Sequence, residues 1–268
     1  MIDLGLAHLT ALELAPAVLV GEAARAGFRA VGLRLHPTTP GGIAYPSKVG
    51  SPAHRALANA LKAAGVRLMD VEFISLTPEI DVAALSPLLE ASADLGATSI
   101  LTSSEDPEPA RLLANFAALC DLARPLSLRI DLEFMPWRQV ATLAKAHAMV
   151  RAADKRNAGI VVDALHLSRS GGKASDLASI PPGLLRAMQI CDAPAAIPAT
   201  EAAIIAEART HRLPPGEGGL PLVALLQALP RDIFISVEMP SPITDPTARI
   251  SRAFTATKHL VEGLRPRA

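Results

Sequence analysis

Four polar side chains lie at the ends of short hydrophobic runs in the second half of the chain. Glu133, Asp163 and Glu238 each close a run rich in Ile, Leu and Val, and Gln189 lies in a run of the same kind. A buried charge is costly unless it is paired or bound to a metal, and carboxylates at close range repel one another. Three carboxylates and an amide oxygen form a hard donor set that suits Mg²⁺ or Mn²⁺. If these runs are neighbouring strands, the sequence predicts a site for one divalent metal ion.

Ion pairs with arginines are the alternative explanation for the same carboxylates. Arg129 and Arg34 lie in runs of the same type, and each could neutralise an acid on its own or a neighbouring strand. Such pairing explains one isolated carboxylate well, but it explains four polar residues at matching strand ends less well. We therefore expect the four side chains to converge on a common ion.

A second set of residues is suited to hold a substrate. Arg34 and His36 occupy alternate positions of one run, so both point to the same face of a strand. An arginine there can bind a carboxylate or a phosphate through two parallel hydrogen bonds. The alternative is a salt bridge from Arg34 to Asp70 or Glu72. With the additional cations of segment 209–212, these residues favour a small-molecule substrate that is anionic.

Three further features could belong to the same site. His166 follows Asp163 by three residues and could donate to a substrate hydroxyl or move a proton, and a structural histidine bonded to a carbonyl is the alternative. Trp137 follows Glu133 closely and could form a wall of the pocket, or it could simply pack at the rim. The glycine-rich segment 216–219 could bind a phosphate through its amides, but a tight turn before a helix is the simpler expectation.

The elements that must position these residues repeat along the chain. Short hydrophobic runs predict strands at 2–8, 30–36, 66–74, 98–102, 127–134, 159–163, 186–191 and 233–238. Amphipathic stretches rich in Ala and Leu predict helices at 16–26, 52–64, 82–95, 108–123, 139–153, 200–208, 220–228 and 248–264. Alternating strands and helices pair in parallel through right-handed crossovers. The sequence therefore predicts an α/β fold, a (β/α)8 TIM barrel forming a single domain over residues 1–268, with its chemistry at the carboxyl ends of the strands.

Composition excludes several classes of protein. The chain has 268 residues, 50% of them hydrophobic and 19% charged, so it can bury enough surface to fold. Its 26 Lys and Arg residues balance 26 Asp and Glu residues, which argues against a nucleic-acid partner. No run of about 18 apolar residues is free of charges, so no membrane partner is expected. Two cysteines are too few for a disulfide framework and favour a reducing, cytoplasmic location.

The motifs resemble the xylose-isomerase-like (β/α)8 superfamily of sugar isomerases, epimerases and related dehydratases. The resemblance rests on Glu133, the segment Asp163-Ala-Leu-His166, the pattern Gln189-x-x-Asp192, and Glu238. The segment Arg212-Leu-Pro-Pro-Gly-Glu-Gly resembles the recurrent Arg-x-x-x-Gly-x-Gly loop of that superfamily. The resemblance covers essentially the whole chain and is most specific in its second half. It implies that one divalent metal is bound by Glu133, Asp163, Gln189 and Glu238, and that His166 and Arg212 contact the substrate.

Two positions depart from the sugar-epimerase pattern. Gln189 stands where many members have histidine, and Gly32 stands where sugar epimerases commonly have glutamate. Glutamine at position 189 and the segment 163–172 resemble the bacterial 3-dehydroshikimate dehydratases instead. An amide oxygen in place of an imidazole makes the donor set harder, which favours Mg²⁺ or Mn²⁺ over zinc.

The site predicts enolisation chemistry. A metal that binds a ketone and a neighbouring hydroxyl makes the α-carbon proton easier to remove, and Glu133 and Glu238 are the expected acid and base. Return of the proton gives an isomerase or epimerase of a small polyhydroxylated ketone or aldehyde, which we expect first. Loss of a β-hydroxyl gives a dehydratase of the 3-dehydroshikimate type, which is the alternative. A metal-free binding barrel is a further alternative, whereas the even charge balance argues against a DNA-repair endonuclease. The oligomeric state stays open, and a homodimer is compatible with the sequence.

Overall fold

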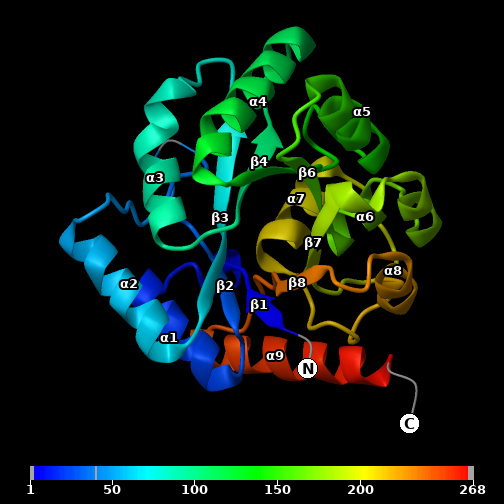
Figure 1. Ribbon diagram of the computed structural model, residues 1–268. Helices are drawn as coiled ribbons and strands as arrows, with labels where there is room; N and C mark the ends of the chain where they lie inside the picture. The colour runs from blue at the N-terminus through cyan, green and yellow to red at the C-terminus, as the bar shows by residue number, and fades with distance from the viewer. Residues whose placement is uncertain (1–2, 40, 265–268) are drawn as a thin grey trace.

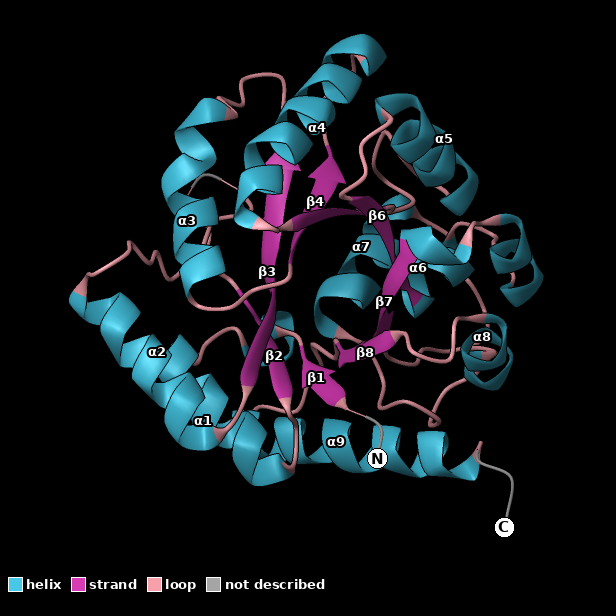
Figure 2. Ribbon diagram, in the orientation of Figure 1, coloured by secondary structure: helices cyan, strands magenta, loops and turns pink. Residues whose placement is uncertain are grey.

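Short hydrophobic segments of the chain pair side by side into a barrel, and the amphipathic segments cover it (Figures 1 and 2). This arrangement is seen in a computed structural model that describes residues 3–39 and 41–264. The strands are β1 (Leu4–Leu6), β2 (Ala30–Leu33), β3 (Arg67–Leu76), β4 (Ser99–Ser104), β5 (Arg129–Glu133), β6 (Ala158–Asp163), β7 (Leu185–Ile190) and β8 (Phe234–Val237). The α-helices are α1 (Pro16–Ala26), α2 (Pro52–Ala64), α3 (Ser86–Asp94), α4 (Pro109–Ala123), α5 (Leu143–Ala153), α6 (Ala164–Arg169), α7 (Glu201–Thr210), α8 (Leu222–Ala228) and α9 (Pro246–Gly263).

The strands form a closed parallel barrel in the order of the chain. Each strand from β1 to β7 pairs with the next one, and β8 pairs back to β1, where Leu4 lies opposite Ile235 and Leu6 lies opposite Val237. All carboxyl ends therefore lie at one mouth of the barrel, which is the geometry that the predicted chemistry requires. The predicted (β/α)8 TIM barrel is confirmed over the described residues.

Local signals define the first two helices. Helix α1 begins with Pro16 and ends before Gly27, whose φ of 112° is a left-handed conformation that favours glycine. Helix α2 begins after Ser51, whose hydroxyl accepts a hydrogen bond from the amide of His54, and it ends before Gly65. Both helices have the bounds that the sequence predicts, because proline and glycine mark their ends.

The structure differs from the prediction in two places that affect the site. Strand β2 ends at Leu33, because the backbone amide of Arg34 donates to Nδ1 of His8 at 2.9 Å and the chain turns away. His36 therefore lies in a loop and not in a strand. Helix α6 is absent from the predicted elements, and it starts immediately after β6 without an intervening turn.

A small apolar cluster fills the barrel interior, separate from the larger core between strands and helices. It contains Leu101, Val161 and Ala187, with Phe73 and Phe234 packed against it. Gly5 on β1 leaves room for the Phe234 ring, because a Cβ atom at position 5 would overlap that ring. Glycine at position 5 therefore allows the Phe234 ring to fill this part of the barrel interior.

Replacing Gly5 by alanine should destabilise the fold, whereas Gly21→Ala should stabilise it. The new methyl group at position 5 forces the Phe234 ring out of place, which costs about 1–3 kcal/mol of unfolding free energy. Gly21 lies inside α1, and apart from the adjacent helix backbone no described atom lies within 4 Å of the place that an added methyl group would take. Alanine there should therefore add about 0.5–1 kcal/mol through helix propensity. Urea unfolding of the two variants measures both effects, and equal shifts in the same direction would contradict the role of Gly5.

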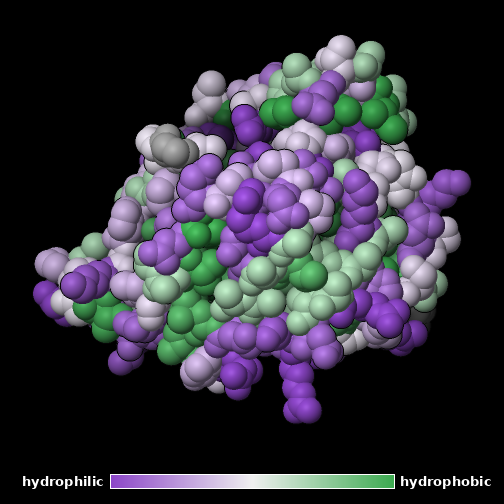
Figure 3. Space-filling view, turned by 90° about the horizontal axis from the view of Figure 1, so that it is seen from above, coloured by the Kyte–Doolittle hydropathy of each residue, from purple (hydrophilic) through white to green (hydrophobic). Residues whose placement is uncertain are grey.

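The face seen in Figure 3 and the length of the described helices bear on membrane crossing. Hydrophilic and hydrophobic side chains are mixed over the face seen in Figure 3. No described helix has the length and apolar character that crossing a bilayer requires.

Candidate active site

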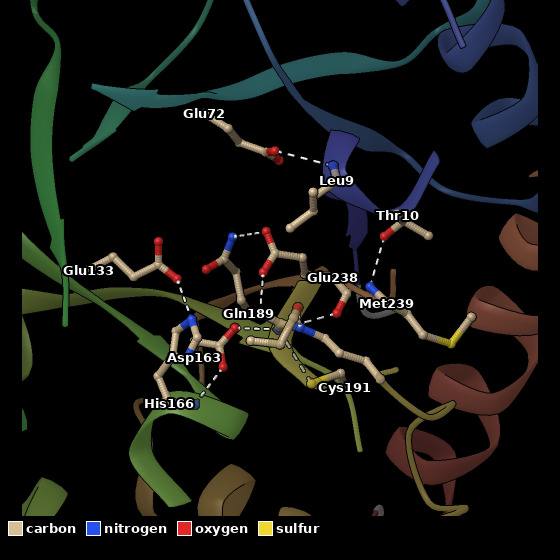
Figure 4. A network of polar contacts seen from close by, with 12 residues as sticks. Leu9, Thr10, Glu72, Glu133, Asp163, His166, Gln189, Cys191, Glu238 and Met239 are labelled. Carbon is tan, nitrogen blue, oxygen red and sulfur yellow. Dashed lines mark hydrogen bonds and ion pairs between the residues drawn. The ribbon is translucent and has the colours of Figure 1, made fainter. Parts of the chain in front are cut away.

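Glu133, Asp163, Gln189 and Glu238 meet at the barrel mouth (Figure 4). Glu133 and Asp163 are the last residues of β5 and β6, Gln189 lies near the end of β7, and Glu238 follows β8 directly. Their strands are neighbours, with Asp163 paired to Gln189 in the β6–β7 register. All four side chains are buried, and Nε2 of Gln189 donates to Oε1 of Glu238 at 3.0 Å. The structure places the four side chains at one mouth, and their convergence on a common ion and their role as metal ligands remain predictions.

His166 joins this group through helix α6. Asp163 is at once the end of β6 and the N-cap of α6, because its Oδ1 accepts a hydrogen bond from the amide of His166 at 2.9 Å. This short helix turns the imidazole back toward the mouth, and Nε2 of His166 lies 3.4 Å from Oε1 of Glu133 (Figure 4). Ligand atoms of Glu133, Asp163 and His166 lie within 4.8 Å of one another, which makes these residues a candidate metal-binding triad. Sequence reasoning assigns His166 only contact with substrate or proton transfer, although the capping position of Asp163 three residues earlier could have indicated the turn.

Arg212 lies fully inside the carboxylate cluster. One terminal nitrogen of its guanidinium donates to Oδ2 of Asp163 at 2.6 Å, and the other lies 2.9 Å from Oε2 of Glu238. The alternative expectation named Arg34 or Arg129 as the arginine that pairs with these acids. The arginine found there is Arg212, whereas Arg129 pairs with Asp131. The structure thus shows Arg212 as a partner of two acids, and its contact with substrate remains a prediction.

Burial and mutual repulsion separate the carboxyl groups in acidity. Burial, together with Glu238 and Asp163, raises the pKa of Glu133 well above its usual range. Burial also raises the pKa of Glu238 to about 8, although Arg212 opposes the shift. For Asp163 the effect of burial is outweighed by Arg212, so its pKa is lowered. One guanidinium therefore compensates three carboxyl groups incompletely.

The donor set fits a divalent cation. Oε1 of Glu133 and Oε1 of Gln189 are buried, and within the described part of the chain neither has a hydrogen-bond donor. Buried polar atoms without partners are rare and costly, and coordination to a cation is one way to satisfy such an oxygen. Burial lowers the pKa of His166 to about 4, so its imidazole is neutral near pH 7 and retains a lone pair. These carboxylate, amide and imidazole donors are suited to a hard or borderline divalent metal.

A cavity of about 280 Å³ opens beside this cluster. Of the residues predicted to hold substrate, Arg34, Trp137 and Arg212 line it, together with the predicted catalytic residues Glu133, His166 and Glu238. Trp137 packs edge-on against His166, with ring centroids 5.1 Å apart. His36 is not among the described residues that line the cavity, because the chain leaves β2 before reaching it. Sequence reasoning did not single out Phe73 or Arg138, although both line the cavity, and Arg209, expected only as an additional cation of segment 209–212, lines it as well.

A turn after β1 holds Arg34 in place. Oε1 of Glu72 accepts the amide of His8 at 2.8 Å, and Nδ1 of His8 accepts the amide of Arg34. The guanidinium of Arg34 lies 3.7 Å from Oε2 of Glu72. The expected alternative, a salt bridge from Arg34 to an acid of β3, is therefore present as a long ion pair with Glu72. Gly32 adjoins both acids of β3, because a Cβ there would overlap oxygens of Asp70 and Glu72.

The glycine-rich segment 216–219 is a turn built around Asp192. The side chain of Asp192 accepts hydrogen bonds from the amides of Gly216 and Leu220, and the amide of Gly219 donates to the carbonyl of Ala193. A Cβ at Gly218 would overlap Asp192 and the Ala193 carbonyl. The amides of Gly216 and Gly219 are already bonded within the turn, which supports the simpler expectation of a tight turn before a helix.

Comparison with known proteins agrees with this geometry. Residues 20–260 match the family model described as "Xylose isomerase-like TIM barrel". A 3-dehydroshikimate dehydratase from Pseudomonas aeruginosa PAO1 is 33% identical over 120 residues, which cover 44% of this chain but only 18% of that protein.

Two solved structures share the fold. The IolI protein, whose crystal structure holds a zinc atom, superimposes with a TM-score of 0.81 at 20% identity, over 99% of this chain and 100% of its own. A D-allulose 3-epimerase from Methylomonas sp. superimposes with a TM-score of 0.72 at 16% identity, over 96% of this chain and 97% of its own. Neighbours of this fold thus include an epimerase, and the sequence relative is a dehydratase. From the extent of the family match, together with the barrel topology, it follows that the chain belongs to the xylose isomerase-like TIM barrel family.

Proposed function

We propose that the protein is a divalent-metal-dependent isomerase or epimerase that enolises a small polyhydroxylated ketone or aldehyde. The observation that carries the proposal is the convergence of Glu133, Asp163 and His166, whose ligand atoms lie within 4.8 Å of one another beside a cavity of about 280 Å³. Glu133, Asp163, Gln189 and Glu238 are the proposed ligands of Mn²⁺ or Mg²⁺, and His166 lies at the edge of the same group. A divalent cation bound there would polarise a substrate carbonyl and make the adjacent C–H bond more acidic.

Glu133 is better placed than Glu238 to move the proton. Both oxygens of Glu238 are engaged, one by the amide of Gln189 and the other by Arg212. Oε1 of Glu133 has no hydrogen-bond donor among the described residues, and it lies 3.4 Å from the neutral imidazole of His166. Burial raises the pKa of Glu133, which makes its carboxylate a stronger base toward an α-proton than an exposed glutamate. Glu133 would thus take the α-proton, and His166 would pass it on or donate to a substrate hydroxyl.

A dehydratase using the same residues is the second candidate. The identity with a 3-dehydroshikimate dehydratase over 120 residues favours it, and so does the glutamine at position 189. The first step, removal of a proton next to a carbonyl, is common to both reactions. The two candidates differ only in whether a β-hydroxyl leaves afterwards.

Proton exchange in D₂O separates the candidates. The purified chain is freed of metal with EDTA, supplied with Mn²⁺ or Mg²⁺, and incubated with small ketoses, aldoses and 3-dehydroshikimate, while NMR follows deuterium at the α-carbon. We expect the metal-loaded protein to convert a ketose or aldose into an isomer or epimer that carries deuterium from the solvent at the enolised position. Loss of water from the substrate would establish the dehydratase instead. Absence of both exchange and metal binding by calorimetry would overturn the proposal in favour of a binding barrel.

A further inference from the structure

Guanidinium groups outnumber carboxylates around the cavity. Arg34, Arg138, Arg209 and Arg212 line it, against Glu133 and Glu238. Arg212 is bound to Asp163 and Glu238, Arg138 pairs with Glu105, and Arg34 lies 3.7 Å from Glu72. The cavity wall thus carries several cationic hydrogen-bond donors that an anionic ligand could reach.

Arg34 is a fixed and incompletely bonded donor. Its side chain is 5% exposed, its guanidinium lies over the Phe73 ring at 5.3 Å, and its backbone is fixed by hydrogen bonds to His8 and Tyr45. The buried Nε has no acceptor among the described residues, and the contact with Glu72, at 3.7 Å, is too long for a hydrogen bond. Since the face of the guanidinium is used by Phe73, its N–H edge remains for a ligand. A buried charged donor of this kind is stabilised by an oxyanion.

Two other arginines add positive charge to the cavity. Arg138 has one ion pair, to Glu105 at 2.8 Å, and its buried Nε has no acceptor in the described part of the chain. Arg209 is exposed at the end of α7 and forms no ion pair with any described residue. Indole Nε1 of Trp137, beside Arg138, is likewise buried without an acceptor among the described residues. The cavity therefore offers hydrogen-bond donors that the protein itself leaves unused.

We propose that Arg34 binds a carboxylate of the substrate, so that the molecule taken by this site is a small polyhydroxylated keto acid. This assignment rests on the proposed function, because it places the reactive end of the same molecule beside Glu133. Arg34 follows β2 and Asp163 ends β6, strands that lie opposite each other in the closed barrel, so the ligand spans the mouth. Arg138 and Arg209 strengthen the positive field without replacing this contact.

A carboxylate fits better than a phosphate for two reasons. The planar N–H edge of a guanidinium matches a carboxylate through two parallel hydrogen bonds, and the cavity of about 280 Å³ lies at the small end of ligand pockets. Phosphate sites commonly use clusters of free backbone amides, and in the glycine-rich segment that could supply them the amides of Gly216 and Gly219 are bonded to Asp192 and Ala193.

Binding of matched polyols to the metal-free protein tests the assignment. D-Gluconate and D-glucitol share a six-carbon polyol chain and differ at one end, which is a carboxylate in the first and a hydroxymethyl group in the second. Trp137 is the only tryptophan of the chain and lines the cavity, so its fluorescence reports occupancy, with calorimetry as the second readout. In EDTA we expect gluconate to bind at least about tenfold more tightly than glucitol, as a charge-assisted hydrogen bond implies.

Variants separate the arginines from one another. Arg34→Gln should weaken gluconate binding about tenfold and leave glucitol binding unchanged, whereas Arg138→Gln and Arg209→Gln should each weaken gluconate binding about two- to fivefold and mainly at low salt. Thr39→Glu places a negative charge on an exposed residue that lines the cavity, so it should weaken gluconate binding without disturbing the core. This variant tests the assignment even if Arg34→Gln does not fold. Arg25→Gln changes an exposed side chain near the end of α1, and as the control it should leave the affinities for gluconate and glucitol unchanged.

Two results would overturn the assignment. The first is equal affinity for gluconate and glucitol in the wild-type protein. The second is tighter binding of D-glucitol 6-phosphate than of gluconate, which would assign the subsite to a phosphate. Because binding is measured without metal or turnover, a preserved gluconate preference with no deuterium exchange contradicts only the proposed reaction. Exchange on neutral sugars without a gluconate preference contradicts only the carboxylate assignment.

Discussion

Replacing Glu133 by glutamine should lower turnover by about 10²–10⁴-fold while making the metal-free fold more stable. The loss of activity follows because glutamine cannot accept the α-proton. The gain in stability follows because the pKa of Glu133 is raised in the folded chain, first by burial and then by Glu238 and Asp163. A carboxyl group with a raised pKa destabilises the fold once it ionises, so the wild type loses stability as the pH rises above the ordinary value of 4.5.

Thermal unfolding in EDTA and deuterium exchange with Mn²⁺ measure the two effects of Glu133→Gln. The variant should melt at a higher temperature than wild type at about pH 8, and the difference should shrink as the pH falls toward 4.5. Glu262→Gln changes an exposed residue of α9 and serves as the control without effect on either quantity. Retention of more than about a tenth of the exchange rate would remove Glu133 from the role of base.

Replacing Arg212 by methionine should cost about 3–5 kcal/mol of unfolding free energy, the second large effect. Arg212 is 2% exposed and bridges Asp163 and Glu238, so its removal leaves two buried carboxylates without the cation that pairs with them. The loss should be greater at about pH 8 than at about pH 5, because protonation relieves an unpaired carboxylate.

Arg252→Met is the matched control for the arginine prediction. Arg252 also pairs with a glutamate, Glu217 at 2.7 Å, but its side chain is 55% exposed, so its removal should cost less than about 1 kcal/mol. Urea unfolding of both variants in EDTA compares a buried with an exposed pair. Equal losses would show that the bridge across the site contributes no more than a surface ion pair.

The barrel can be predicted well from the sequence because its signals are local. Proline and glycine mark the ends of α1 and α2, and hydrophobic runs mark each strand of the closed barrel. Strand β2 is predicted too long because Arg34, Leu35 and His36 continue its alternation. The end of the strand is set by a residue remote in sequence, His8, whose ring accepts the amide of Arg34.

The sequence predicts the positions of the carboxylates of the candidate site, but it does not predict which side chains pair with them. Strand topology alone brings Glu133, Asp163 and Glu238 to one mouth, so their positions at strand ends are sufficient. The bridge from Arg212 depends on the path of the loop after α7, which no local pattern encodes. Helix α6 escapes prediction because its six residues follow a strand directly and its N-cap, Asp163, already has a predicted role as a metal ligand.

The close approach of Gly32 to Asp70 and Glu72 restricts how this barrel can evolve. Even a methyl group at position 32 would overlap oxygens of both β3 acids, so the side chains of Asp70 and Glu72 must move to admit an acidic side chain there. A glutamate gained there would also place a third carboxyl group beside two buried acids whose pKa values burial already raises. We therefore expect an acid at position 32 to destabilise the fold less when position 70 or 72 is no longer acidic.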